Sequence, residues 1–102
     1  MKISLGIKDK HIQYGEKANP QNCAIARAIK DKMHNIDKVG VFPGHVYLVT
    51  RNKKTNKTSA YKAKLTKKVD EFIKRFDDGK PVNSFVVSLD LKHIGKFAKE
   101  IA

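Results

Sequence analysis

Basic side chains in the middle third of this chain are the residues whose types and spacing point most directly to chemistry. No Asp or Glu occurs between Lys38 and Val69, whereas that segment holds nine Lys and Arg residues of a 102-residue chain with a formal net charge of +12. An acid-free block creates a local positive potential that attracts polyanions over a long range. Nucleic acid, an anionic membrane surface and an acidic protein are the partners that this charge favours.

The candidate binding residues lie on a predicted β-hairpin and at the start of the helix that follows it. They are Arg51, Lys53, Lys54, Lys57, Lys62, Lys64, Lys67 and Lys68. Amines on an extended ribbon reach successive phosphates and release counterions, so binding should weaken steeply with salt. Tyr47 and Tyr61 add a stacking surface if they face outward. Because lysine recognises charge rather than base identity, we expect binding to the DNA or RNA backbone without strong sequence specificity.

The same lysines have a second interpretation, in which they keep a solvent-facing hairpin soluble and discourage edge pairing with other strands. The sequence contains no helix-turn-helix, zinc-finger or aromatic ribonucleoprotein motif that would decide between the two. Both interpretations therefore stay open at this stage.

Cys23 is the one residue that suggests catalysis. Near the start of a predicted helix it would feel the helix dipole, and it falls on the same side as Arg27, Lys30 and His34, which would lower its thiol pKa. Nucleophilic catalysis also needs a positioned base and an oxyanion site, and no recognisable signature supplies them. The favoured interpretation is a small buried residue packed beneath the loop from Asp9 to Ala18. We expect no enzymatic activity.

The four histidines give no metal-binding pattern. They occur singly, at His11, His34, His45 and His93, and no Cys-x-x-Cys or His-x-x-x-His pair is present. The run Asp77-Asp78-Gly79 would bind a cation weakly at most, and the glycines form no phosphate-cradling loop. The sequence predicts no metal and no cofactor.

Hydrophobic periodicity predicts the elements that position these residues. Alternation predicts strands at 3–7, at 45–51 and at 59–65, with a short strand at 39–42, a Pro43-Gly44 turn and a polar connector over 52–58. Residues 9–18 are expected to form an ordered loop with one helical turn before Gly15. Asn19-Pro20 has the pattern of a helix start, with a helix to about Asn35 and a stripe of Ile25, Ile29, Met33 and Ile36.

The carboxyl-terminal third predicts a further helix, strand and helix. Thr66 caps a helix with a buried stripe of Val69, Phe72, Ile73 and Phe76, which ends at Gly79 and Pro81. Residues 85–89 form a strand. Asp90 caps a short terminal helix with Ile94, Phe97, Ala98 and Ile101 on one face and Lys92, Lys96 and Lys99 pointing outward.

The order β-α-β-β-β-α-β-α favours an α+β fold, with a mainly antiparallel sheet of about four to five strands and two main helices on one face. We expect the first and last strands to pair near the centre of the sheet. The length fits a single domain over residues 1–102. One cysteine excludes an intrachain disulfide, and neither a signal segment nor a membrane span is visible, so the chain is expected in the cytoplasm.

Two stretches resemble a group of small uncharacterised proteins carried by tailed phages and prophages. They are the loop and helix at 12–15 and 19–26, with Asn-Pro-Gln-Asn-Cys-Ala-Ile-Ala, and the later segment at 69–82, with Phe-Asp-Asp-Gly followed by Val82. The chain departs from that group at Ala24, where Pro is expected, and in its Lys-rich hairpin. The resemblance implies this order of elements and a viral or mobile-element origin, and it assigns no catalytic residue.

A viral origin suggests an alternative function, that of a modulator or inhibitor of a host protein such as a defence or transcription component. A protein of that kind needs an exposed apolar or aromatic patch, for which Phe42, Tyr47 and Phe97 are the candidates. Its partner would be a host protein or nucleoprotein in the host cytoplasm. Its oligomeric state is not indicated by the sequence.

Overall fold

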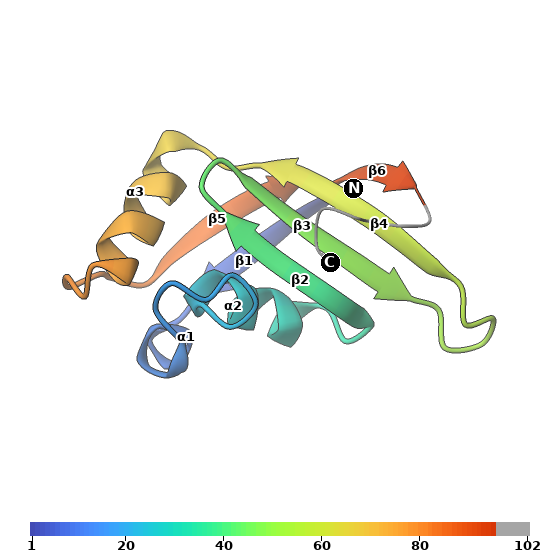
Figure 1. Ribbon diagram of the computed structural model, residues 1–102, viewed down its shortest axis with the longest axis horizontal. Coiled ribbons are helices and arrows are strands. Elements are labelled where there is room, and N and C mark those ends of the chain that lie inside the picture. Colours follow the sequence, from blue (N-terminus) through green and yellow to red (C-terminus); the bar gives the residue numbers. More distant parts are fainter. Residues whose placement is uncertain (96–102) are drawn as a thin grey trace.

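The computed structural model describes residues 1–95, which form six strands and three helices (Figure 1). In chain order these are β1 (Lys2–Ile7), α1 (Asp9–Tyr14), α2 (Ala24–Lys32), β2 (Ile36–Phe42), β3 (His45–Arg51), β4 (Thr58–Lys64), α3 (Lys67–Asp77), β5 (Phe85–Asp90) and β6 (Lys92–Gly95). The strands make two antiparallel sheets, one ordered β2-β3-β4-β6 and the other β1-β5. The predicted α+β class with mainly antiparallel pairing is confirmed.

The predicted pairing of the first strand with the strand at 85–89 is also correct, but its place in the fold is not. β1 and β5 pair in a sheet of their own, with Leu5 opposite Val87, rather than at the centre of one large sheet. In Figure 1 this two-stranded sheet passes behind the four-stranded one. The expected single layer of two helices on a sheet is therefore replaced, in part, by sheet packed on sheet.

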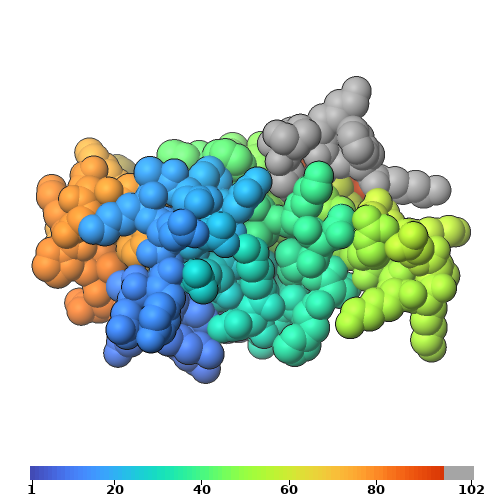
Figure 2. Space-filling view, turned by 60° about the horizontal axis from the view of Figure 1, so that its bottom comes forward, coloured from blue at the N-terminus to red at the C-terminus, as the bar shows by residue number. Residues whose placement is uncertain are grey.

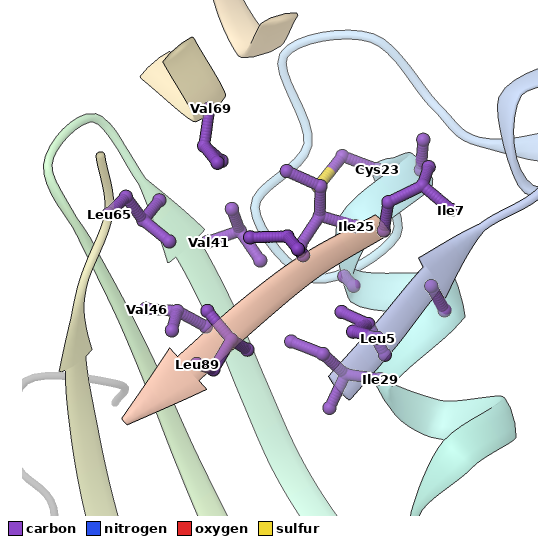
Figure 3. Packing of buried hydrophobic residues seen from close by; sticks show 14 of the residues in the cluster. Leu5, Ile7, Cys23, Ile25, Ile29, Val41, Val46, Leu65, Val69 and Leu89 are labelled. Carbon is purple, nitrogen blue, oxygen red and sulfur yellow. The ribbon is translucent and has the colours of Figure 1, made fainter. Parts of the chain in front are cut away.

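One hydrophobic core joins the two sheets to the helices. Leu5, Ile29 and Leu48 are almost completely buried. Figure 3 shows Leu89 of β5 close to Val46 of β3, with side chains of β1 and α2 pointing into the same core. The two sheets pack together through their core-facing sides, which buries these sides, while the opposite sides face away from this core.

Helix α2 begins later than the Asn19-Pro20 pattern predicts. The backbone carbonyl of Asn19 accepts from the N–H groups of Asn22 and Cys23, which closes a turn before the helix. The Pro20 carbonyl accepts from Val41 N–H of β2 at 2.9 Å. A helix starting at Pro20 would need that carbonyl for its own ladder, so the bond to the edge strand delays the start to Ala24, with Cys23 as N-cap residue.

Two further elements differ from the predictions. Residues 9–14 form helix α1 rather than a loop with a single turn. The segment after Asp90 forms strand β6, which pairs with β4, instead of beginning a helix. Met1 and Leu91 exchange two backbone hydrogen bonds, of 2.7 and 2.9 Å, which hold this segment extended. The rest of the expected terminal helix, including Phe97, Ala98 and Ile101, lies outside the described residues.

Helix α3 matches its prediction closely. The Thr66 side chain accepts from Val69 N–H, and the four expected apolar residues are buried. The turn between β2 and β3 is tied to this helix, because Gly44 N–H donates to Asp70 Oδ1 at 2.7 Å. Gly44 has a φ of +87°, which glycine adopts without steric cost. Within residues 1–95 no helix is long and apolar enough to cross a membrane.

Candidate nucleic-acid interface

The basic hairpin is the β3–β4 pair, and it lies inside the four-stranded sheet. Directly paired residues of antiparallel strands share a face, so the register divides the sheet into two sides. The inner side carries the core residues Val39, Val41, Val46, Leu48 and Ala63. The other side, called the outer face below, carries Lys38, Gly40 and Phe42 of β2, His45, Tyr47 and Val49 of β3, Ala60, Lys62 and Lys64 of β4, and Lys92 of β6.

Positive charge dominates the outer face. Asp37 is the only acidic residue in the four strands of this sheet, and it sits at the irregular step between Ile36 and Lys38. Its carboxylate is paired with Arg51, which donates from Nε and Nη2 at 3.2 Å each. The Arg51 hydrogen bond lowers the pKa of Asp37, and the same pair raises the pKa of Arg51. The single acid of the sheet is therefore matched by one cation, and the lysines are left in excess.

Tyr47 is the centre of an aromatic cluster on the outer face. Its ring meets Phe42 edge to face at 6.0 Å and lies nearly parallel to His45 at 6.2 Å between centroids. The Lys62 ammonium sits over the Tyr47 ring, 5.5 Å from its centroid. A cation–π contact at a partly exposed site contributes about 0.5–1 kcal/mol. Val49 and Ala60 are buried beside Tyr47 and support its position.

Lysines from two strands converge next to this cluster. Lys62 and Lys92 are directly paired across β4 and β6, and like charges placed directly opposite each other destabilise a sheet. A hollow of about 380 Å³ is lined by both, together with Lys64, Asp90 and Ile94. Three ammonium groups against one carboxylate leave this hollow positive. An anion bound there would relieve the repulsion.

The hairpin tip is ordered by its asparagines rather than by its lysines. The side chain of Asn52 accepts from Lys54 N–H at 2.9 Å, and Arg51 Nη1 donates to the side chain of Asn56 at 2.8 Å. Arg51 thus joins the tip to the β2 edge, and it is the only predicted site residue in an ion pair within residues 1–95. Lys53, Lys54 and Lys57 are exposed on the tip.

The structure does not gather all eight predicted residues in one patch. The tip lies at one end of the molecule and α3, with Lys67 and Lys68 at its start, lies at the other (Figures 1 and 2). Lys62 and Lys64 lie between them on β4. The eight residues follow the length of the hairpin, with four at the tip end, two on β4 and two at the start of α3.

The two predicted stacking tyrosines lie on opposite sides of the sheet. Tyr47 is on the outer face, whereas Tyr61 is on the inner side, packed against the core and edge to face with His93 at 5.4 Å. Lys38, His45 and Lys92 were missing from the predicted site, although all three lie on the outer face with Tyr47. The predicted strand ended at residue 89. Leu89, Leu91 and His93 alternate with the charged residues Asp90 and Lys92, and this alternation could have predicted an extended segment that includes Lys92.

Cys23 is the N-cap residue of α2 and is only 6% exposed. Burial raises the pKa of its thiol. The backbone N–H groups of Ala26 and Ile25 at the helix start lower that pKa, but their effect is smaller than that of burial. The dipole argument for a lowered pKa is therefore wrong at this site, and the interpretation as a small packed residue is confirmed. Burial dominates because the thiolate would lose hydration in the core.

His11 joins α1 to α2 and is only 5% exposed. Its Nδ1 accepts from Lys8 N–H at 2.9 Å, so the ring proton lies on Nε2, which donates to Asp31 Oδ2 at 2.7 Å. Both ring nitrogens are therefore occupied, and the contact acts as a structural link. Among residues 1–95 no group of three or more His, Cys, Asp or Glu residues is arranged to hold a metal ion.

Comparisons with protein-family models, with curated proteins and with solved structures give no match. The resemblance to phage and prophage proteins therefore stays a prediction. The function proposed below is inferred from the residues of the outer face alone.

Proposed function

We propose that this chain is a non-enzymatic, basic accessory protein of the cytoplasm that binds the phosphate backbone of nucleic acid without strong sequence specificity. The observation that carries the proposal is the outer face, where the Lys62 ammonium lies over the Tyr47 ring, Lys92 is paired with Lys62, and the only acid of the four strands is paired with Arg51. Directly opposed lysines such as Lys62 and Lys92 are unfavourable without an anion. A protein that needed these lysines only for solubility would gain nothing from placing two of them opposite each other.

The predominance of lysine on the outer face favours contact with phosphate and disfavours recognition of the base sequence. The ammonium groups of Lys62, Lys64 and Lys92 contact phosphate as point charges and do not distinguish base edges. Each neutralised phosphate releases condensed counterions, so the logarithm of the affinity should fall linearly with the logarithm of the salt concentration. The slope of that line counts the phosphates contacted.

The test is fluorescence anisotropy with labelled DNA and RNA across a salt series. Lys62→Gln/Lys64→Gln should weaken binding of both and lower the salt slope by about one for each lysine that contacts phosphate. The control is Lys32→Gln/Lys74→Gln, which removes the same charge from exposed positions on α2 and α3. A third pair, Lys53→Gln/Lys54→Gln, measures the contribution of the tip. Absence of binding at low salt, or equal losses in the control and the sheet pair, would overturn the proposal.

A second candidate, a phage-encoded modulator of a host protein, is supported by the contact between Phe42 and Tyr47. Both rings are partly exposed, and they form an aromatic patch beside the lysines. This candidate predicts a specific partner that survives nuclease treatment and is still bound by Lys62→Gln/Lys64→Gln. It also predicts that Phe42→Ser abolishes binding of that partner protein. Loss of the partner after nuclease treatment would favour nucleic acid instead.

A further inference from the structure

Four residues form a row across the outer face, perpendicular to the strands. The register aligns Gly40 of β2, Tyr47 of β3, Lys62 of β4 and Lys92 of β6. Neighbouring strands are about 4.8 Å apart, so the backbone positions of Lys62 and Lys92 follow that of Tyr47 at intervals of one strand. A flat ring beside two cations matches the parts of a nucleotide, in which a base and a phosphate are separated by one sugar.

Among the described residues, the Tyr47 ring is contacted by the rings of Phe42 and His45 and by the Lys62 ammonium over its face. Phe42 meets it edge to face and His45 lies alongside, so its orientation is fixed by neighbours. The group over the ring is the Lys62 ammonium at the end of a flexible chain. A phosphate would draw that ammonium sideways towards Lys92, and a base could then take its place, because base stacking on an aromatic ring is stronger than an exposed cation–π contact.

We propose that the row of Tyr47, Lys62 and Lys92 is a stacking subsite for an unpaired base, so that this chain prefers single-stranded nucleic acid to duplex. The inference rests on the proposed function and adds the class of nucleic acid to it. In a duplex the faces of the bases are already stacked on each other, so a duplex meets the lysines of the outer face but not the Tyr47 ring.

Electrostatics alone predicts the opposite preference. A duplex carries a higher density of phosphate charge than a single strand and releases more counterions for each contact. A surface that only attracted charge would therefore bind duplex at least as tightly. A single strand is also more flexible than a duplex, so the decisive comparison is with an abasic single strand, which keeps the phosphates and the flexibility and lacks the bases.

The experiment measures binding of the full chain to four labelled probes at matched salt. The probes are oligothymidylate, oligouridylate, a DNA duplex of equal length, and an abasic single strand with the same number of phosphates. The two single strands with bases should bind about tenfold more tightly than the duplex and the abasic strand. Similar affinity for the DNA and RNA strands would show that the subsite does not sense the sugar, and tighter binding of RNA would narrow the ligand to RNA. Both results support stacking.

Variants assign the preference to the ring. Tyr47→Leu keeps an apolar side chain and should bind the two single strands with bases no more tightly than the abasic strand, with duplex binding unchanged, whereas Tyr47→Phe should retain the preference. Tyr14→Leu is the matched control, since Tyr14 is 63% exposed on α1 and lies off the four-stranded sheet. Should Tyr47→Leu fail to fold, quenching of 2-aminopurine in a strand bound to the unaltered chain reports stacking independently.

Each outcome separates the two proposals. Equal or tighter binding of duplex, an unchanged preference in Tyr47→Leu, or absence of 2-aminopurine quenching overturns the stacking subsite and leaves backbone binding intact. Absence of binding to every probe at low salt overturns both.

Discussion

The ring of Phe42 lies over the backbone of Gly40, so that a β-carbon at position 40 would come within 2.8 Å of ring carbon Cε2. Glycine at this position lets an aromatic side chain settle flat on its own strand and reach Tyr47 on the next one. The aromatic cluster of the outer face thus depends on a residue that contributes no side chain.

Gly40→Ala should destabilise the protein by roughly 0.5–1.5 kcal/mol, because the Phe42 ring must leave its preferred rotamer. It should also weaken the contact between Phe42 and Tyr47. Gly6→Ala is the matched control, since Gly6 lies in strand β1 with no atom within 4 Å of the added carbon. That variant should be neutral or stabilised by about 0.4–1 kcal/mol, because alanine restricts the unfolded chain. Denaturant unfolding of both variants measures the difference, and equal stabilities would contradict this account.

Asp31→Asn should lower stability at neutral pH but not in acid. Hydrogen bonds from His11 and Lys10 lower the pKa of Asp31 in the folded protein. A carboxyl group whose pKa is lower in the folded than in the unfolded chain stabilises the folded protein at pH values above its unfolded pKa, which is about 3.9. This stabilisation is lost as the pH falls through the pKa of the folded state. Because the Asp31 side chain is 55% exposed, the loss at pH 7 should be only about 0.5–1 kcal/mol.

The measurement for Asp31 is urea unfolding of the unaltered chain and the variant at neutral pH and below pH 3. The two stabilities should converge in acid. Glu16→Gln, at an exposed position, controls for the loss of one carboxylate. A difference that persisted unchanged in acid would show that the amide perturbs the contact for a reason other than charge.

Arg51 should act as a positioning residue for the hairpin tip and not as a phosphate contact. Arg51→Lys removes the forked contact with Asp37 and the bond to Asn56, so the Asn56 N–H, which donates to the Asn52 carbonyl at 2.7 Å, should exchange with solvent faster. The affinity for nucleic acid should change little, since a positive charge remains. Hydrogen exchange and anisotropy measure the two effects. A large loss of affinity with unchanged exchange would reverse the assignment.

Asp37→Asn should strengthen binding of polyanions, because it frees the Arg51 guanidinium from its only described ion pair. The salt slope should become steeper by up to about one. Asp78→Asn, at the C-cap of α3, makes the same change in net charge away from the outer face. Equal gains in the two variants would show that net charge alone governs the affinity.

Cys23 should react with iodoacetamide no faster than the protein unfolds. Its side chain is packed in the core, and burial raises the pKa of the thiol, so little thiolate is accessible near neutral pH. Denaturant should make the reaction fast. Rapid stoichiometric alkylation of the folded protein would reopen the question of catalysis at this residue.

Sequence patterns determined the parts of this protein that depend on neighbours along the chain. The 3.6-residue spacing from Val69 to Phe76 specified α3, the Thr66 side chain capped it, and the Pro43-Gly44 pair closed the turn between β2 and β3. Alternation also showed that Lys62 and Lys64 face away from Ala63. These features are local, because spacing and turn chemistry act over a few residues.

Only the tertiary structure decided which basic residues lie together. Pairing of β4 with β6 placed Lys92 beside Lys62, and the bond from Val41 to Pro20 moved the start of α2. The same sheet geometry separated Tyr47, on the outer face, from Tyr61, on the inner side. A charge pattern along the chain carries no information about these pairings, because backbone hydrogen bonds between distant strands set the register. The sequence by itself determined that a basic hairpin exists, and the register of the four-stranded sheet decided that its middle, around Tyr47, is the candidate site.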